Sequence, residues 1–76
     1  RRGGKFDLVF LDPPYDSDLL EKALEVIQIV DILNDGGIIV CESRREKSLP
    51  DLEPPYRKTL VRRYGKVCLT VYKKET

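Results

Sequence analysis

The stretch FDLVFLDPPY, residues 6–15, decides the fold of this chain, because in it a short apolar run ends at a carboxylate, two prolines and an aromatic ring. Its apolar part, residues 6–11, is nearly continuous, which is typical of a parallel strand buried on both faces. Pro13 and Pro14 then end the strand, because neither has an N–H to donate to a neighbouring strand. Ligands of open α/β sheets bind at the carboxyl ends of the strands, so residues 12–15 are the predicted ligand site.

The rest of the chain predicts a strand, helix, strand unit followed by a hairpin. Apolar residues recur at helical spacing behind Asp18, which with Glu21 has the form of a capping box. Residues 34–37, NDGG, are expected to end the helix as a loop, and a charged loop is expected at Ser43–Pro55. The helix and the three further strands are predicted at residues 18–33, 38–41, 58–64 and 67–72.

This set of elements leaves the α/β sheet incomplete. One helix cannot cover both faces of four strands, and the strand at residues 6–11 would lie at an unpaired edge, which is a liability for a monomer. The chain of 76 residues allows one domain at most, and it has no Met at its start or anywhere else. We therefore expect residues 1–76 to be a partial domain. The cover would come from a missing N-terminal half or from a second copy that pairs through the sheet edge or the uncovered face.

Composition excludes several classes of protein. The chain has no apolar run approaching the roughly 20 residues that span a bilayer, and its basic start lacks the apolar stretch of a signal peptide. A cytoplasmic protein without a membrane segment is expected. With no histidine and no paired cysteine spacing, no metal site is expected. Cys41 and Cys68 each lie in a predicted strand and are interpreted as buried, reduced thiols rather than as a disulfide.

The distribution of charge is strongly asymmetric. Residues 12–42 contain eight acidic side chains and one basic side chain, whereas residues 43–66 contain eight basic and three acidic ones. If the basic side chains converge, they would hold a phosphate backbone; the alternative is that they are solvated charges on loop and strand faces. Arg44, Arg45 and Lys47 are the candidate substrate-binding cations, because their loop leaves the end of a strand.

The chemistry of residues 12–15 suits an exocyclic amino group on a nucleobase. That nitrogen is a poor nucleophile, and hydrogen-bond acceptors aimed at both of its N–H bonds stabilise the positive charge that develops during an attack. The Asp12 carboxylate and the Pro13 carbonyl can be these acceptors, because Pro13 and Pro14 bring no competing N–H donors. Tyr15 offers a face for an unstacked base, worth roughly 1–3 kcal/mol. The alternative is a plain turn that ends the strand, with Tyr15 at its rim.

Residues 6–15 resemble the motif-IV strand and loop of the S-adenosylmethionine-dependent amino-methyltransferases. The likeness continues through GIIVCE, residues 37–42, and through Tyr64-Gly65 to the last strand, so that the whole pattern is similar to the C-terminal half of the RsmD family. This family consists of bacterial enzymes that methylate guanine N2 in small-subunit ribosomal RNA. The resemblance implies a Rossmann-like α/β fold, of which this chain supplies strands in the spatial order 4-5-7-6, with the last strand antiparallel and one long helix.

The resemblance also implies roles for individual residues. Catalysis would fall to Asp12, Pro13, Pro14 and Tyr15, and the methyl group would pass directly from the cofactor sulfonium, without a metal or a nucleophilic cysteine. Leu11 and Asp12 would border the cofactor. Tyr15 would stack on a base of the substrate, which is ribosomal RNA either free or in an assembling small subunit. The charge and position of Arg44, Arg45 and Lys47, rather than the resemblance, suggest that they bind its phosphates.

One departure from the family affects activity. The family binds its cofactor on a Gly-rich loop after the first strand of the fold, and no glycines of this chain have that spacing or context. The 76 residues alone are therefore expected to bind S-adenosylmethionine weakly or not at all and to be inactive. Two alternatives for function remain. One is N6-adenine or N4-cytosine methylation of DNA or another substrate, and the other is a non-catalytic module that binds nucleic acid.

Overall fold

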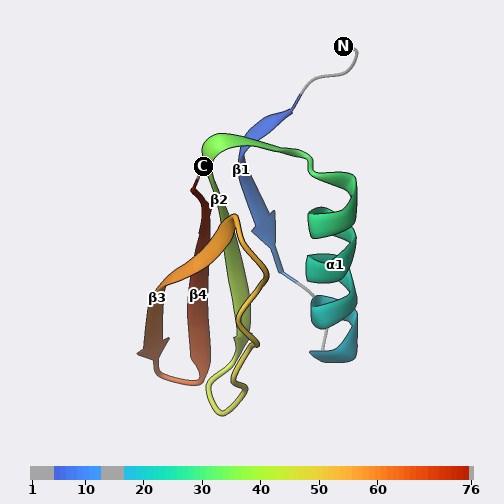
Figure 1. Cartoon of the computed structure of the whole chain (residues 1–76). Coiled ribbons are helices and arrows are strands. Elements are labelled where there is room, and N and C mark those ends of the chain that lie inside the picture. Colours follow the sequence, from blue (N-terminus) through green and yellow to red (C-terminus); the bar gives the residue numbers. More distant parts are fainter. Residues whose placement is uncertain (1–4, 13–16, 76) are drawn as a thin grey trace.

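In the computed structural model the chain forms a four-stranded sheet with one helix on one of its faces (Figure 1). The structure describes residues 5–12 and 17–75. The elements in chain order are β1 (Phe6–Leu11), α1 (Ser17–Val30), β2 (Leu33–Arg44), β3 (Tyr56–Tyr64) and β4 (Val67–Lys74). No helix in the described part of the chain is long and apolar enough to cross a membrane.

The order of the strands in the sheet is β1-β2-β4-β3. β1 and β2 are parallel and are joined through α1, whereas β4 lies antiparallel between β2 and β3. This arrangement confirms the order 4-5-7-6 with a reversed last strand that the sequence predicts. It places the carboxyl ends of β1 and β2 and the turn between β3 and β4 at one end of the sheet (Figure 1).

The predicted boundary between the helix and the second strand was wrong. The helix ends at Val30 rather than Leu33, because Asp31 has a φ of 59° and its amide donates to the Ile27 carbonyl at 2.8 Å. A left-handed residue of this kind ends a helix, and aspartate is one of the few non-glycine residues that tolerates the conformation. The expected loop at residues 34–37 lies within β2, as an irregular insertion where the register with β1 shifts.

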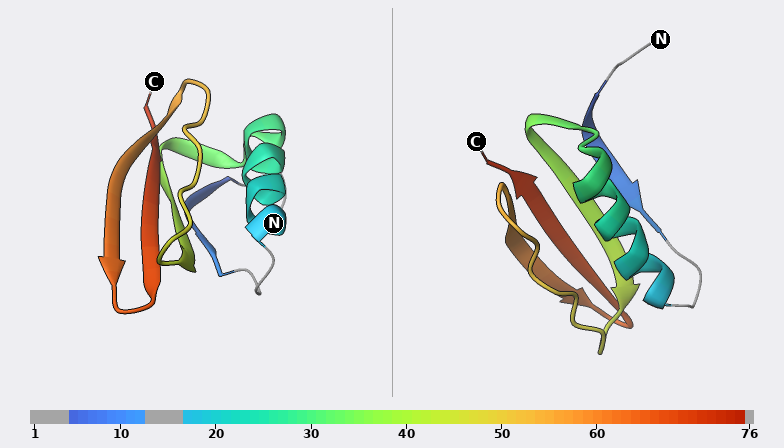
Figure 2. Two further views of the ribbon diagram at one scale, coloured as in Figure 1. Left: turned by 90° about the horizontal axis from the view of Figure 1, so that it is seen from below. Right: turned by 45° about the vertical axis from the view of Figure 1, so that its right-hand side comes forward.

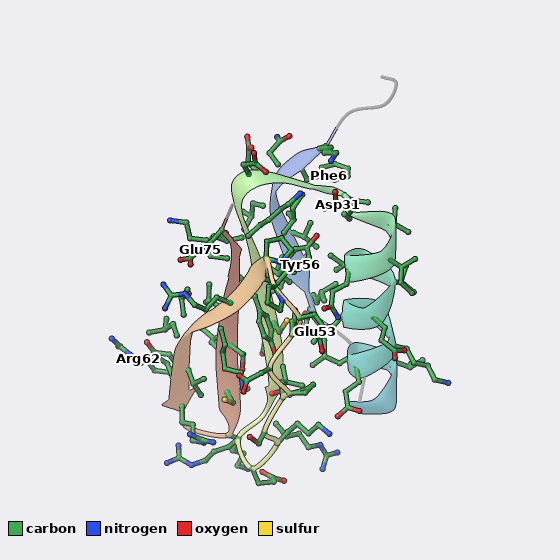
Figure 3. The ribbon with its side chains drawn as sticks, in the orientation of Figure 1. Phe6, Asp31, Glu53, Tyr56, Arg62 and Glu75 are labelled. Carbon is green, nitrogen blue, oxygen red and sulfur yellow. The ribbon has the colours of Figure 1, made fainter. Side chains whose placement is uncertain are left out.

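A polar cluster holds the left-handed Asp31 in place. Its Oδ1 accepts hydrogen bonds from Lys74 Nζ at 2.6 Å and from the Tyr56 hydroxyl at 2.9 Å, and Lys74 Nζ also donates to the Leu33 carbonyl at 3.0 Å. The bonds from Lys74 and Tyr56, with a further one from Lys5, lower the pKa of Asp31 to about 2. Figure 3 shows Asp31 and Tyr56 at the end of the sheet opposite the turn between β3 and β4.

The hydrophobic core lies on one face of the sheet. α1 covers it on the side of β1 and β2, and the loop of residues 45–55 runs over the same face beside the helix (Figure 2). The loop is anchored by the buried Leu49 and by the Tyr72 hydroxyl, which donates to the Pro50 carbonyl at 2.6 Å. The core residues are Leu20, Leu24, Ile27, Leu33, Ile39, Cys41, Leu49, Tyr56 and Tyr72.

Both cysteines are buried, as the sequence predicts. Cys41 lies in β2 and Cys68 in β4, and both thiols are free. Burial raises the pKa of the Cys41 thiol to about 12. Because the thiolate is the nucleophilic form of cysteine, we interpret this buried thiol as part of the core rather than as a nucleophile.

The opposite face of the sheet, which we call the open face, carries apolar side chains that this chain does not cover. Leu8 and Phe10 of β1 are 57% and 54% exposed, and the register places them beside Ile38 and Val40 of β2. The prediction that β1 is buried on both faces was therefore wrong for these 76 residues. The physical reason is that the single helix packs on the other face, as the expected shortage of cover implies.

Candidate active site

Asp12 follows β1 directly and lies at the carboxyl edge of the parallel pair. Leu11, the last residue of β1, is in register with Cys41 of β2. Asp12 and Glu42 are the residues that follow them in the chain. Asp12 is exposed, and Glu42 is half-buried. Glu42 thus lies on the strand next to the one that leads to Asp12, although the sequence analysis singled out only Asp12. Glu42 was missed because its neighbour is set by the register of the sheet.

The other residues of the predicted catalytic segment, Pro13, Pro14 and Tyr15, lie outside the described residues. Their roles therefore stay predictions. α1 begins at Ser17, so the chain crosses from the edge of the sheet to the start of the helix within residues 12–17. Leu11, predicted to border a cofactor, is half-buried and packs against the core.

The three predicted substrate-binding cations fall into two settings. Arg44 ends β2 and Arg45 follows it, both exposed, and with Glu46, Gly65 and Lys66 they line a hollow of about 340 Å³. Lys47 instead extends to α1, where its Nζ lies 2.7 Å from Glu21 Oε2. The structure thus brings two of the three cations together and engages the third in an ion pair with the helix.

The hairpin formed by β3 and β4 adds residues that the sequence analysis did not assign to the site. Arg45 donates through its amide to the Lys66 carbonyl at 2.9 Å and through Nη1 to the Gly65 carbonyl at 3.1 Å. Arg63 Nε donates to the Arg45 carbonyl at 3.0 Å. The strand order implied by the resemblance was the one signal that could have placed this turn beside residues 44 and 45.

The described residues fit the part of an active site that binds the amino group of a substrate, but not the part that binds the cofactor. An exposed carboxylate at the carboxyl end of a parallel strand suits an acceptor for an amino group, as the sequence predicts. Of the glycines that the structure describes, Gly36 and Gly37 lie within β2 and Gly65 in the β3–β4 turn, and none forms a strand-to-helix loop. Among the described residues no group of three or more His, Cys, Asp or Glu side chains could hold a metal ion.

The sheet with its reversed last strand is similar to several solved structures, among them proteins named as putative methylases. It superposes with a TM-score of 0.83 on a conserved hypothetical protein of Streptococcus pyogenes, with 33% identity over 95% of this chain and 45% of the other. It superposes with a TM-score of 0.82 on the "Putative methyltransferase yhhF" of Escherichia coli, with 28% identity over 100% of this chain and 43% of that one. The architecture is therefore that of a methyltransferase, in agreement with the expected fold class.

The family follows from the sequence comparisons. Residues 1–73 match the family described as conserved hypothetical protein 95, and the chain belongs to this family, which is the RsmD family that the sequence resembles. It is 35% identical over 74 residues to the "Putative rRNA methyltransferase YlbH" of Bacillus subtilis, a match that covers 97% of this chain and 40% of that protein. The chain thus spans less than half the length of these relatives.

Proposed function

We propose that these 76 residues are the acceptor-orienting part of a cytoplasmic, S-adenosylmethionine-dependent methyltransferase that modifies guanine N2 in small-subunit ribosomal RNA. The observation that carries the proposal is the position of Asp12, an exposed carboxylate at the carboxyl end of β1 in a methyltransferase fold. The name of the Bacillus subtilis relative supports ribosomal RNA as the substrate. Residues 1–76 would form a partial domain of the whole protein.

In the proposed mechanism this chain orients the nucleophile. The Asp12 carboxylate and the Pro13 carbonyl accept the two N–H bonds of the target amino group, which directs the nitrogen lone pair away from them. Tyr15 stacks on the base after it has left its helix. S-adenosylmethionine, when bound, supplies the electrophilic methyl group. The reaction needs no covalent intermediate, so neither buried thiol takes part.

The test of the substrate is the ribosomal RNA of a strain that lacks the parent gene. We expect nucleoside mass spectrometry to show that one N2-methylguanosine is lost from the small-subunit RNA, and expression of the parent gene to restore it. An unchanged level of this nucleoside would contradict the proposal. A loss of N6-methyladenosine or N4-methylcytidine would instead support the sister reaction on another amino group.

The chain alone is expected to bind S-adenosylmethionine weakly or not at all and to show no turnover. The reason is that the described glycines lie in β2 (Gly36 and Gly37) and in the β3–β4 turn (Gly65), and none of them forms a cofactor-binding loop. We expect that loop to be supplied by another part of the whole protein. Calorimetric titration of the 76 residues should give no measurable heat. The whole protein is the positive control, and micromolar affinity in the short chain would refute the expectation.

The open face and the unpaired edge of β1 bear on partners. We propose that in the whole protein polypeptide outside residues 1–76 covers the edge of β1 and the apolar part of the open face around Leu8 and Phe10, because the similar solved structures are more than twice as long. A homodimer through the same edge or face is the alternative.

The basic hollow at residues 44–46 also favours a second candidate function, a non-catalytic module that binds nucleic acid. Such a module differs from the enzyme because it does not need Asp12.

A further inference from the structure

The ends of three strands meet beside the turn of the β3–β4 hairpin. Arg44 of β2, Val67 of β4 and Tyr64 of β3 are in register, and they form the last row of the sheet. The next row into the sheet consists of Ser43, Cys68 and Arg63. Their side chains lie on the core face, where Cys68 is buried. Because side chains alternate along a strand, Arg44 and Tyr64 belong to the open face.

Arg62 joins this group from β3. It lies two residues before Tyr64 and therefore on the same face, and its Nη1 is 3.5 Å from the Tyr64 hydroxyl. Figure 3 shows Arg62 projecting from β3 away from α1. Lys66, at the turn itself, is exposed and lines the hollow with Arg44 and Arg45. We call these five residues the hairpin-end surface: Arg44, Arg45, Arg62, Tyr64 and Lys66.

The hairpin-end surface is held in shape by hydrogen bonds between its segments. Two bonds from Arg45, to the Lys66 and Gly65 carbonyls, and one from Arg63 to the Arg45 carbonyl tie the end of β2 to the turn. Gly65 has a φ of 52°, which lets the turn present its carbonyl to Arg45. Three cations, Arg44, Arg45 and Lys66, thus line one hollow, and Arg62 lies on β3 next to Tyr64. Glu46 is the single acidic residue among those lining the hollow.

The chemistry of this surface suits a single strand of RNA. Lysine and arginine side chains hold phosphates, and an exposed aromatic ring supplies a face on which a base stacks without regard to its identity. Tyr64 is 51% exposed, so its ring has a face open to such stacking. An acidic protein would use the cations but would have no need of an exposed ring. The combination therefore favours RNA over a protein partner.

The distance to Asp12 indicates which part of the RNA is bound. β4 and β3 are the second and third strands away from β1 in the sheet. At about 4.8 Å between strands, Arg62 and Tyr64 on β3 lie about 14 Å from β1, the strand that precedes Asp12, whereas Arg44 and Arg45 lie at the end of the adjacent strand β2. With about 3.4 Å per nucleotide in a stacked strand, the separation of about 14 Å corresponds to about four nucleotides. Arg62 and Tyr64 are thus too far away to hold the target nucleotide itself.

We infer that the hairpin-end surface binds the RNA strand that flanks the target nucleotide, with phosphates on its cations and a base on Tyr64. This inference rests on the proposed function for the nature of the substrate. It assigns the β3–β4 hairpin to positioning the RNA, whereas Asp12 acts on the amino group.

The test measures binding of the whole protein to a fluorescein-labelled 12-nucleotide single-stranded RNA by anisotropy, at several KCl concentrations. In the double variant Arg62→Gln, Lys66→Gln we expect binding to weaken. The slope of the logarithm of the association constant against the logarithm of the salt concentration should become less steep by about 1.4, because each lost phosphate contact removes about 0.7 from the slope. Tyr64→Leu should weaken binding about tenfold and leave the slope unchanged, and Tyr64→Phe should retain binding.

The matched control is Arg57→Gln, Lys73→Gln, which removes the same charge from a pair in register at the opposite end of the same two strands. Its salt slope should equal that of the wild type. Equal slopes in the two double variants, no binding of the RNA by the wild type, or an effect of the Arg62 and Lys66 changes on a poly-glutamate peptide but not on RNA would each overturn the inference.

Failure of the proposed function is distinguishable from failure of this inference. Asp12→Ala should bind the labelled RNA like the wild type, since Asp12 lies outside the hairpin-end surface. If the wild type transfers no methyl group to ribosomal RNA but the hairpin variants lose RNA binding, the enzymatic proposal fails and the inference stands. If the hairpin variants bind like the wild type while Asp12→Ala alone loses transfer, the inference fails and the enzyme stands.

Discussion

Replacement of Asp12 by alanine in the whole protein is expected to lower kcat for methyl transfer by about 10²–10³-fold, the usual effect of removing one preorganised group that stabilises developing charge. Asp12 is the described member of the predicted acceptor pair, and it lies exposed where β1 ends beside β2. Its side chain is exposed, so the fold should survive the change. The loss should fall on kcat more than on binding of the RNA.

The measurement is transfer of a labelled methyl group to small-subunit ribosomal RNA under single-turnover conditions. Affinity for S-adenosylmethionine and the melting temperature are followed in parallel, to show that the variant is folded. Asp51→Ala is the control, because the Asp51 side chain is 88% exposed and lies on the loop that packs beside α1. If Asp12→Ala retained a rate within a few-fold of the wild type, residues 12–15 would be a plain turn and the proposed role of Asp12 would be refuted.

Replacement of Phe10 by alanine should destabilise the whole protein by about 3–5 kcal/mol, the range for a buried phenylalanine. In the part of the chain that the structure describes, the side chain of Phe10 is 54% exposed, so about half of its area still faces water. Burial of about 100 Å² of apolar surface stabilises the folded state by about 2.5 kcal/mol. Leaving the side chain of Phe10 in solvent therefore forgoes a large stabilisation. The large expected cost follows only if further polypeptide packs on Phe10.

Chemical denaturation of the whole protein provides the measurement, with Val61→Ala as the control. Val61 is 42% exposed and lies on β3, at the opposite edge of the sheet, so its loss should cost less than about 1 kcal/mol. Equal costs at the two positions would mean that the open face stays in solvent. If a second copy supplies the cover instead, the melting temperature of the wild type should rise with protein concentration.

Much of the fold could be predicted because its signals are local. The continuous apolar run of residues 6–11 indicates a buried strand, and the recurrence of Leu20, Leu24 and Ile27 places one face of a helix on the core. The order of the strands came from the resemblance to a family. The predicted end of the helix was wrong, because the bonds that hold Asp31 in its left-handed conformation come from Tyr56 and Lys74, 25 and 43 residues further along the chain.

The sequence by itself determined the class of fold, the burial of the cysteines and the carboxylate at the end of β1, since each depends on residues that are neighbours in the chain or on its periodicity. Only the tertiary structure decided where the cations go. Lys47 meets Glu21 across 26 residues, whereas Arg45 meets Gly65 across 20. The contact of Arg45 arises because the antiparallel β4 carries the hairpin turn back to the end of β2, and that of Lys47 arises because the loop after β2 runs beside α1. Such side chains, distant in sequence, become neighbours only when the chain has folded.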